Sequence, residues 1–269
     1  MTIAVNLFAA IAWLATWLLI RMRLRERLGG SVPRQRTLLI AVWLVALIVH
    51  GLSILNHVWQ THGVVIHFTA AGSLVMWLSS LLLFVVMLKR PLETLGLFIV
   101  PPTLVAMLLP WLASGNTAPL YLNNGLGVHI LVSLLAYSML TLAALQALVL
   151  AWQNRHLHNH QPVGVVRTLP PLLDMEALLF KLLLLGVILL AFGLLSGALY
   201  VDNLFAQHLV HKTVLSIIAL IIFTGLLLGR WLWGWRGRMA IRWTLGGFVV
   251  LMLAFFGSKF VLEFLVTRP

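Results

Sequence analysis

The sequence predicts an all-α, polytopic integral membrane protein with eight transmembrane helices, and three observations support this. Of the 269 residues, 62% are hydrophobic and only 9% are charged, whereas a soluble domain is about 45–50% apolar and about 25% charged. The hydrophobic residues form long unbroken runs rather than alternating strands, which is typical of membrane-spanning helices. The chain has no cysteine, so disulfide frameworks, thiolate metal sites and thiol chemistry are excluded.

Eight apolar segments, each of about 20 residues, are the expected helices. The first has no basic n-region or small-residue cleavage site, so we interpret it as a retained helix rather than a signal peptide. Three prolines are expected to interrupt the fourth segment, and Pro170 and Pro171 should end the loop before the sixth. The segments cover residues 2–20, 37–56, 68–88, 92–112, 129–152, 177–200, 211–229 and 241–262.

The connections between these segments alternate in charge. Lys and Arg gather in 21–36, 89–91, 153–176 and 230–240, while 57–67, 113–128 and 201–210 contain neither. By the positive-inside rule the basic connections are cytoplasmic, so both the N and the C terminus are expected outside. We find no repeat and no separate soluble region, so residues 1–269 are predicted to form a single membrane domain.

The formal charge of +12 follows the same connections instead of forming one patch, which argues against nucleic acid as a partner and for membrane lipids. Trp231, Trp233 and Trp235 precede Arg236 and Arg238 at one such connection. We interpret this group as an ordinary interfacial aromatic belt, with the arginines meeting anionic headgroups.

Histidines concentrate at the outer side of the predicted topology. An imidazole inside a membrane is costly when charged, so it normally pairs, ligates or lines a cavity. For those in loops an interfacial hydrogen bond is the favoured interpretation. For His50 and His129, which lie in or at the head of apolar runs, a functional role is favoured over such a structural one. The seven histidines on this side are His50, His57, His62, His67, His129, His208 and His211.

His129 begins a polar stripe along the fifth segment. Ser133 follows at i+4 and Tyr137 at i+8, so all three share one helical face that should turn toward other helices. Neutral imidazole ligates zinc, copper or haem iron. The sequence has no H-E-x-x-H motif, and Asp202 is the only carboxylate in the outer loops, so catalytic zinc is not favoured. A haem held by helix-borne imidazoles fits these residues better.

Three stretches of the second half resemble a known family. They are "VHILVSLLAYSMLTLAALQALVLAW" (128–152), "HKTVLSIIALIIFTGLLLGRW" (211–231) and "GWRGRMAIRWTLGGFVVLMLAFFGSKFVLEF" (234–264). The chain resembles the CcsA/CcmC-type cytochrome c assembly membrane proteins, and within them the YpjD-type branch. The resemblance covers about residues 125–264, and its most specific part is the W-R-G-R turn before a helix containing FFGS.

The resemblance implies a multi-pass protein of the bacterial inner membrane that binds or moves haem b, with cytochrome c assembly proteins or other membrane proteins as partners. It implies haem handling rather than a catalysed reaction. His129 matches the family's histidine in "H…SYA", here "H…AYS", and becomes the first axial ligand. His50 or His211 is the expected second ligand, and Lys212 is expected either near the propionates or in a salt bridge with Asp202. The candidate cofactor-binding residues are His129, His50, His211, Lys212, Ser133 and Tyr137.

The chain also departs from the family pattern. The tryptophan-rich W-x-W-D segment expected before the seventh helix is missing, because 201–212 reads "VDNLFAQHLVHK", and the family's histidine after the last helix is absent. Without an aromatic surface to stack on a porphyrin, holding haem is a better hypothesis than delivering it. The alternative is a non-enzymatic membrane scaffold or accessory subunit that kept the fold and lost the haem site. A small-molecule transporter is a third hypothesis.

Overall fold

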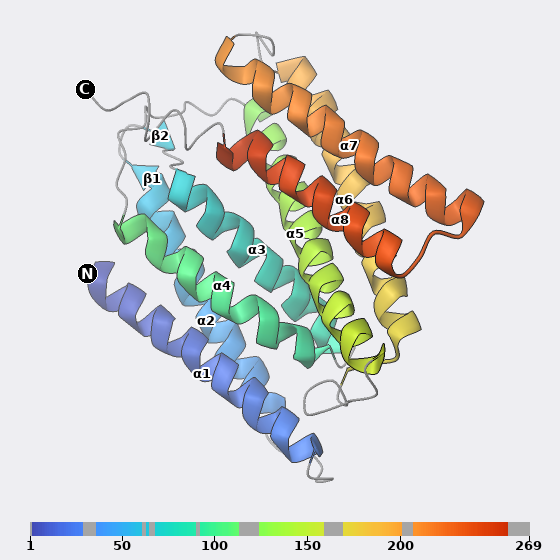
Figure 1. Cartoon of the computed structure of the whole chain (residues 1–269). Coiled ribbons are helices and arrows are strands. Elements are labelled where there is room, and N and C mark those ends of the chain that lie inside the picture. Colours follow the sequence, from blue (N-terminus) through green and yellow to red (C-terminus); the bar gives the residue numbers. More distant parts are fainter. Residues whose placement is uncertain are drawn as a thin grey trace. The chain divides into compact units, whose positions relative to one another are not determined.

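The structure is a computed structural model that describes residues 2–28, 36–60, 63–64, 68–89, 92–112, 124–158, 169–200 and 207–257. This part of the chain contains eight helices that are long and apolar enough to cross a membrane (Figure 1). The predicted all-α membrane fold is therefore confirmed. The predicted outside location of both termini stays a prediction.

Each predicted segment overlaps one observed helix. A short π-helical turn, η2 (Leu253–Gly257), continues the last helix, and the predicted residues beyond 257 lie outside the described part. The helices are α1 (Thr2–Leu28), α2 (Arg36–Val58), α3 (Phe68–Lys89), α4 (Glu93–Leu112), α5 (Asn124–His158), α6 (Leu172–Tyr200), α7 (Gln207–Trp233) and α8 (Arg238–Met252).

Two helix boundaries and one hairpin refine the prediction. Helix α1 continues past Arg21 to Leu28, since arginine is a good helix former whose aliphatic stem covers apolar surface. Pro170 and Pro171 precede the sixth helix as expected, but α6 begins at Leu172, earlier than the predicted start at residue 177. Strands β1 (Trp59–Gln60) and β2 (Gly63–Val64) form a short antiparallel pair after α2, which the sequence did not predict.

The prolines of α4 do not interrupt it, contrary to the expectation. The helix runs through Pro101, Pro102 and Pro110. Pro101 has no N–H, so the carbonyl of Leu97 one turn earlier loses its helical donor. The indole Nε1 of Trp17 on α1 donates to that carbonyl at 3.2 Å. A neighbouring helix thus satisfies the freed backbone group, which is how membrane helices tolerate proline.

The chain divides into two compact units. The first comprises residues 1–114 and 152–172, and the second comprises 115–151 and 173–269, so α5 contributes to both. In the first unit α1 and α3 each pack against α2 and α4, which closes a four-helix bundle (Figure 1). Trp13 of α1 and Trp43 of α2 are fully buried. The predicted single membrane domain stays a prediction.

In the second unit small residues bring the helices close together. A Cβ atom on Gly186 of α6 would lie 2.7 Å from Leu140 of α5, and one on Gly247 of α8 would lie 2.8 Å from Phe223 of α7. Only glycine permits these approaches, which is typical of helix packing in membranes. Helix α7 also packs against η2.

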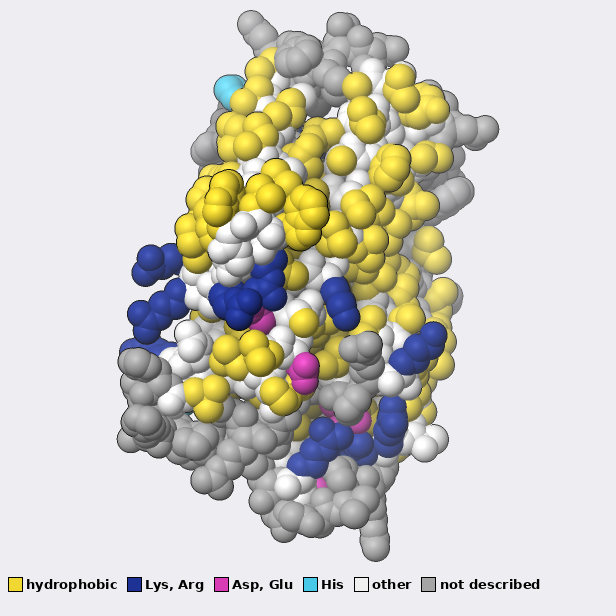
Figure 2. All heavy atoms as spheres, turned by 90° about the vertical axis from the view of Figure 1, so that its right-hand side faces the viewer, with side chains coloured by type: hydrophobic (Ala, Val, Ile, Leu, Met, Phe, Trp, Pro, Cys, Tyr) yellow, Lys and Arg dark blue, Asp and Glu magenta, His cyan; other side chains and the backbone are white. Residues whose placement is uncertain are grey.

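The outer faces of the helices are apolar. Leu173, Phe192 and Ile221 are exposed, and many similar side chains share this property. Figure 2 shows hydrophobic side chains over most of one face, with Lys and Arg side chains gathered in groups. Such a surface suits lipid rather than water.

Candidate functional site

The ring of His129 is anchored through one nitrogen. His129 is half buried on α5, and its Nδ1 lies 3.0 Å from the Gly193 carbonyl oxygen and 3.1 Å from the Ser196 hydroxyl, both on α6. Because a carbonyl oxygen only accepts, Nδ1 carries the proton and donates to Gly193. The neutral ring then keeps its lone pair on Nε2, the usual ligating atom when Nδ1 is held in this way.

Two glycines of α6 make room for this ring and for the polar stripe beside it. A Cβ atom on Gly197 would lie 3.0 Å from Cε1 of His129, and one on Gly193 would lie 3.3 Å from Oγ of Ser133. These approaches are closer than ordinary van der Waals contact, so the small residues set the distance between α5 and α6. Ser133 therefore faces α6, and the predicted orientation of the stripe toward other helices is confirmed.

Tyr137 continues the stripe into the interior of the second unit. It is buried, and its hydroxyl donates to the carbonyl oxygen of Leu251 at 3.4 Å. Its ring packs against Phe255 with the centroids 5.6 Å apart. Phe255 belongs to η2, the π-helical turn that includes the first three residues of the FFGS stretch. Because π-helical turns interrupt regular i→i−4 bonding, a side-chain donor can reach a carbonyl there.

Neighbouring residues of α7 differ in their surroundings. His211 is exposed, whereas Lys212 is half buried and its Nζ lies 4.7 Å from the centroid of the Phe255 ring. Lys212 is also within electrostatic range of His129. Successive residues of a helix point about 100° apart, so the structure brings Lys212, and not His211, to this group. We call His129, Ser133, Tyr137, Lys212 and Phe255 the His129 cluster.

His50 lies in the first unit in a different environment. It is fully buried on α2, and its Nε2 lies 2.9 Å from Oγ of Ser73 on α3. The Trp13 ring of α1 meets the imidazole edge to face with centroids 6.0 Å apart. Both Nδ1 of His50 and Nε1 of Trp13 are buried without a hydrogen-bond partner. His50 is thus enclosed by three helices of its own unit.

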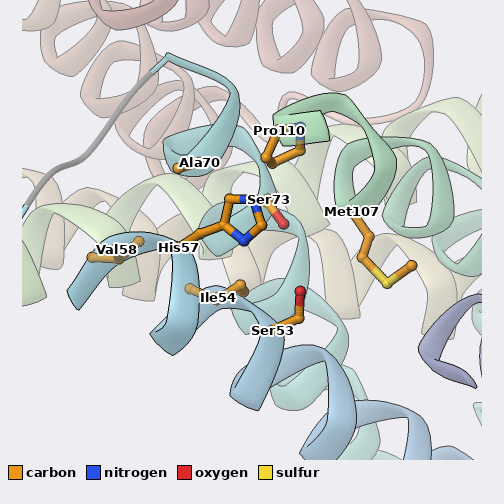
Figure 3. Close-up of a pocket in the computed structure, with 8 residues that line it drawn as sticks. All are labelled: Ser53, Ile54, His57, Val58, Ala70, Ser73, Met107 and Pro110. Carbon is orange, nitrogen blue, oxygen red and sulfur yellow. The ribbon is translucent and has the colours of Figure 1, made fainter. Parts of the chain in front are cut away.

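A small pocket lies close to this enclosed histidine. Ser73, which contacts His50, lines it together with Ser53, and Ser53 donates a hydrogen bond to Asn6 of α1. His57 also lines it and lies beside Ser73 in the close-up (Figure 3). The volume of about 10 Å³ is roughly that of one water molecule and far below that of a porphyrin. The full lining is Ser53, Ile54, His57, Val58, Ala70, Ser73, Met107 and Pro110.

The comparison with protein families identifies the family of this chain. The family described as cytochrome c assembly protein matches residues 36–266, which cover parts of both units and the whole His129 cluster. The chain belongs to the cytochrome c assembly protein family. The resemblance predicted from the second half of the sequence is thereby confirmed and extends into the first half.

Individual relatives agree with this assignment. Over 137 residues the chain is 41% identical to the inner membrane protein YpjD of Escherichia coli K12, which covers 51% of this chain and 52% of YpjD. The match thus spans about half the length of YpjD. The chain is 33% identical over 205 residues to an uncharacterized 28.8 kDa protein in the nifR3-like 5′ region of Azospirillum brasilense, covering 72% of this chain and 76% of that protein. No solved structure matches.

These relationships and the eight apolar helices confirm the predicted localisation: this cytochrome c assembly family member is a multi-pass protein of the inner membrane.

Sequence reasoning did not predict that Ser73 contacts His50 and that Ser196 contacts His129, because serine is common in membrane helices and carries no spacing signal. It also missed Phe255 as a neighbour of Lys212, although Phe255 lies in the FFGS stretch that carries the resemblance. His62, His67 and Asp202 lie outside the described residues, as does the side chain of His208.

Proposed function

We propose that the protein binds haem b at the His129 cluster, on the side of the membrane that the loop charges predict to be the outer one. The observation that supports this best is the His129 ring itself. Its Nδ1 is held by the Gly193 carbonyl at 3.0 Å, which leaves the Nε2 lone pair for iron.

The residues of the His129 cluster fit a haem. The Nε2 atom can act as an axial ligand, the Lys212 ammonium can neutralise a propionate, and Phe255 offers an aromatic ring. Among the residues between 2 and 257 that the structure describes, no three His, Asp or Glu side chains gather as a metal site. A haem does not need such a group, because the porphyrin supplies the other ligands of its iron.

The residues of the His129 cluster and Gly193 would each have a separate role in holding haem. His129 would hold the iron, and Gly193 would hold His129 in the ligating tautomer. Lys212 would orient the propionate edge, while Tyr137 would keep the aromatic wall in place through its contact with Phe255. The bound haem would supply a redox-active iron. The proposed function is therefore binding and holding of haem.

The second axial ligand remains the sequence-based proposal of His50 or His211. Nδ1 is the atom of His50 without a partner, since Nε2 already contacts Ser73. His211 is exposed next to Lys212. A ligand that is lost changes the spin state of the iron, so separate alanine variants at the two positions distinguish them.

The direct experiment is the absorption spectrum of protein purified in detergent from cells with an ample haem supply. We expect a Soret band with low-spin, bis-imidazole character. His129→Ala should lose the haem, and His129→Gly should regain it when free imidazole is added, because the small ligand can enter the space of the missing ring.

His156→Ala is the matched control. His156 lies on the same helix, and its Nδ1 also donates to a carbonyl oxygen, that of Trp152 at 2.9 Å. This variant should keep the wild-type spectrum. Wild-type protein without a chromophore, or equal haem content in His129→Ala and wild type, would overturn the proposal.

A scaffold or accessory subunit is the second candidate, and one observation favours it. Residues 201–212 contain no tryptophan, so the stacking surface implied by the family resemblance is missing. Under this function the chain would hold other membrane proteins of cytochrome c assembly without carrying haem itself. Stable co-purification of one defined membrane partner with a colourless wild-type protein would support it over haem binding.

A further inference from the structure

The connection between α7 and α8 has features that the haem site does not use. We call residues Trp231–Trp243 the tryptophan–arginine turn. Its arginines are Arg236, Arg238 and Arg242, and all three side chains are exposed. Arg238 and Arg242 lie one turn apart on α8, so they share a face.

A buried carboxylate of α6 holds this turn in one conformation. Glu176 is 3% exposed, accepts from Nη1 of Arg230 at 2.6 Å and accepts from the backbone N–H of Gly237 at 3.2 Å. Gly234 and Gly237 have φ values of 66° and 57°, a region that favours glycine. The carboxylate and the two glycines together define the path of the turn.

Indole rings line the turn in a row. The Trp233 and Trp235 rings are nearly parallel, with centroids 5.7 Å apart, and Trp235 lies 5.6 Å from Trp243 of α8. Gly229 permits this row, because a Cβ atom there would collide with Trp235. The aromatic surface is therefore ordered by contacts that involve the end of α7, the connecting residues and the start of α8.

The exposed arginines of the turn differ from the other well-placed arginines of the chain. Arg23 and Arg230 are engaged by Glu93 and Glu176. In the described part of the chain Arg236, Arg238 and Arg242 have neither an ion pair nor a hydrogen bond. Since Arg230 already satisfies Glu176, the turn presents three uncompensated positive charges next to its indole rings.

We propose that the tryptophan–arginine turn is a specific binding site for an anionic phospholipid. The guanidinium groups match the oxygens of a phosphodiester through bidentate hydrogen bonds, and indole rings prefer the headgroup level of a bilayer. Trp231 and Trp233 are 82% and 68% exposed. A lipid covers this apolar surface, whereas a free phosphate leaves it bare.

The test is native mass spectrometry of the full chain in detergent, titrated separately with phosphatidylglycerol, phosphatidylcholine and inorganic phosphate. The wild type should retain phosphatidylglycerol in preference to phosphatidylcholine and should not retain phosphate. The variant R236Q/R238Q/R242Q should lose the preference by about tenfold or more, since each arginine near an anionic headgroup contributes to binding.

The matched control removes the same number of charges elsewhere. Arg25, Lys89 and Arg155 are exposed at other connections that the sequence predicts to be cytoplasmic, and R25Q/K89Q/R155Q should keep the wild-type preference. Equal loss in both triple variants would mean that net charge alone attracts the lipid and would overturn the proposal, as would equal retention of the two lipids by the wild type. Glu176→Gln, which loosens the turn without removing a positive charge, should weaken the preference.

Discussion

The two compact units contain the same kinds of polar side chain in opposite settings. In the first unit His50 is fully buried, and the Arg23–Glu93 pair is 5% and 3% exposed. In the second unit His129 is half buried, and the Arg230 side chain of the Arg230–Glu176 pair is 33% exposed. The first unit encloses His50 and the Arg23–Glu93 pair, whereas the second leaves part of His129 and of Arg230 exposed.

This difference separates a stabilising role from a binding role. A charge or imidazole enclosed by apolar helices depends on partners within the protein, because neither lipid nor water replaces them. A group that is held on one side and accessible on the other can receive a ligand. Apart from His50, which stays a candidate second axial ligand, we therefore expect substitutions in the first unit to act mainly on stability, and those in the second to act mainly on binding.

The largest expected effect on stability is at Glu93, and the ion pair of Glu176 is its comparison. Glu93 accepts from Arg23 at 3.0 Å and forms a second ion pair with Arg27 at 3.2 Å. Glu93→Gln leaves Arg23 buried without its counter-charge, so it should lower the free energy of unfolding by about 3–5 kcal/mol. Glu176→Gln should cost only about 1 kcal/mol, because water or headgroups reach Arg230. Unfolding by SDS titration in mixed micelles measures both, and equal losses would contradict the contrast.

When haem is absent, His50→Ala should also lower the free energy of unfolding more than His129→Ala does. His50→Ala removes a fully buried ring that packs on Trp13, so we expect a loss of about 2–4 kcal/mol. His129→Ala removes the hydrogen bond to Gly193 from a half-buried side chain, and about 1 kcal/mol is expected. The same titration on haem-free protein measures this. A greater loss for His129→Ala would reverse the assignment of roles.

A glycine pair sharpens the comparison within the second unit. Gly197→Ala would place a methyl group 3.0 Å from Cε1 of His129, tilting the ring and weakening haem binding by about tenfold, or about 1.4 kcal/mol. A Cβ atom on Gly246 of α8 would meet no other atom within 4 Å, so Gly246→Ala should leave haem binding unchanged. Haem titration followed at the Soret band compares the two variants. Similar haem affinities of the two variants would show that the position of the His129 ring does not affect haem binding.

The smallest effect is expected at Tyr137. Its hydrogen bond to Leu251 is long, 3.4 Å, so Tyr137→Phe should lower the unfolding free energy by only about 0.5–1 kcal/mol. The ring contact with Phe255 is retained in this variant, so haem binding should persist. SDS titration and the absorption spectrum together measure both properties. Loss of the haem in Tyr137→Phe would mean that the hydroxyl itself belongs to the binding site.

Much of the fold could be predicted because each helix follows from the hydrophobicity of its own stretch of the chain. A run of about 20 apolar residues is long enough to cross a bilayer wherever it occurs, so all eight helices were located. The ends were less certain, as α1 shows by continuing to Leu28. The continuity of α4 through Pro101 required Trp17, a residue of another helix, to satisfy the Leu97 carbonyl.

By itself, the sequence determined the number and position of the helices, the family relationship and the polar stripe from His129 to Tyr137. Only the tertiary structure determined that Gly193 anchors His129, that Ser73 and Trp13 enclose His50, and that Lys212 approaches Phe255 while His211 does not. The physical reason is that lipid and protein interior are both apolar. Hydrophobic periodicity therefore does not specify the rotation of a membrane helix, and the partners come from residues far apart in the chain.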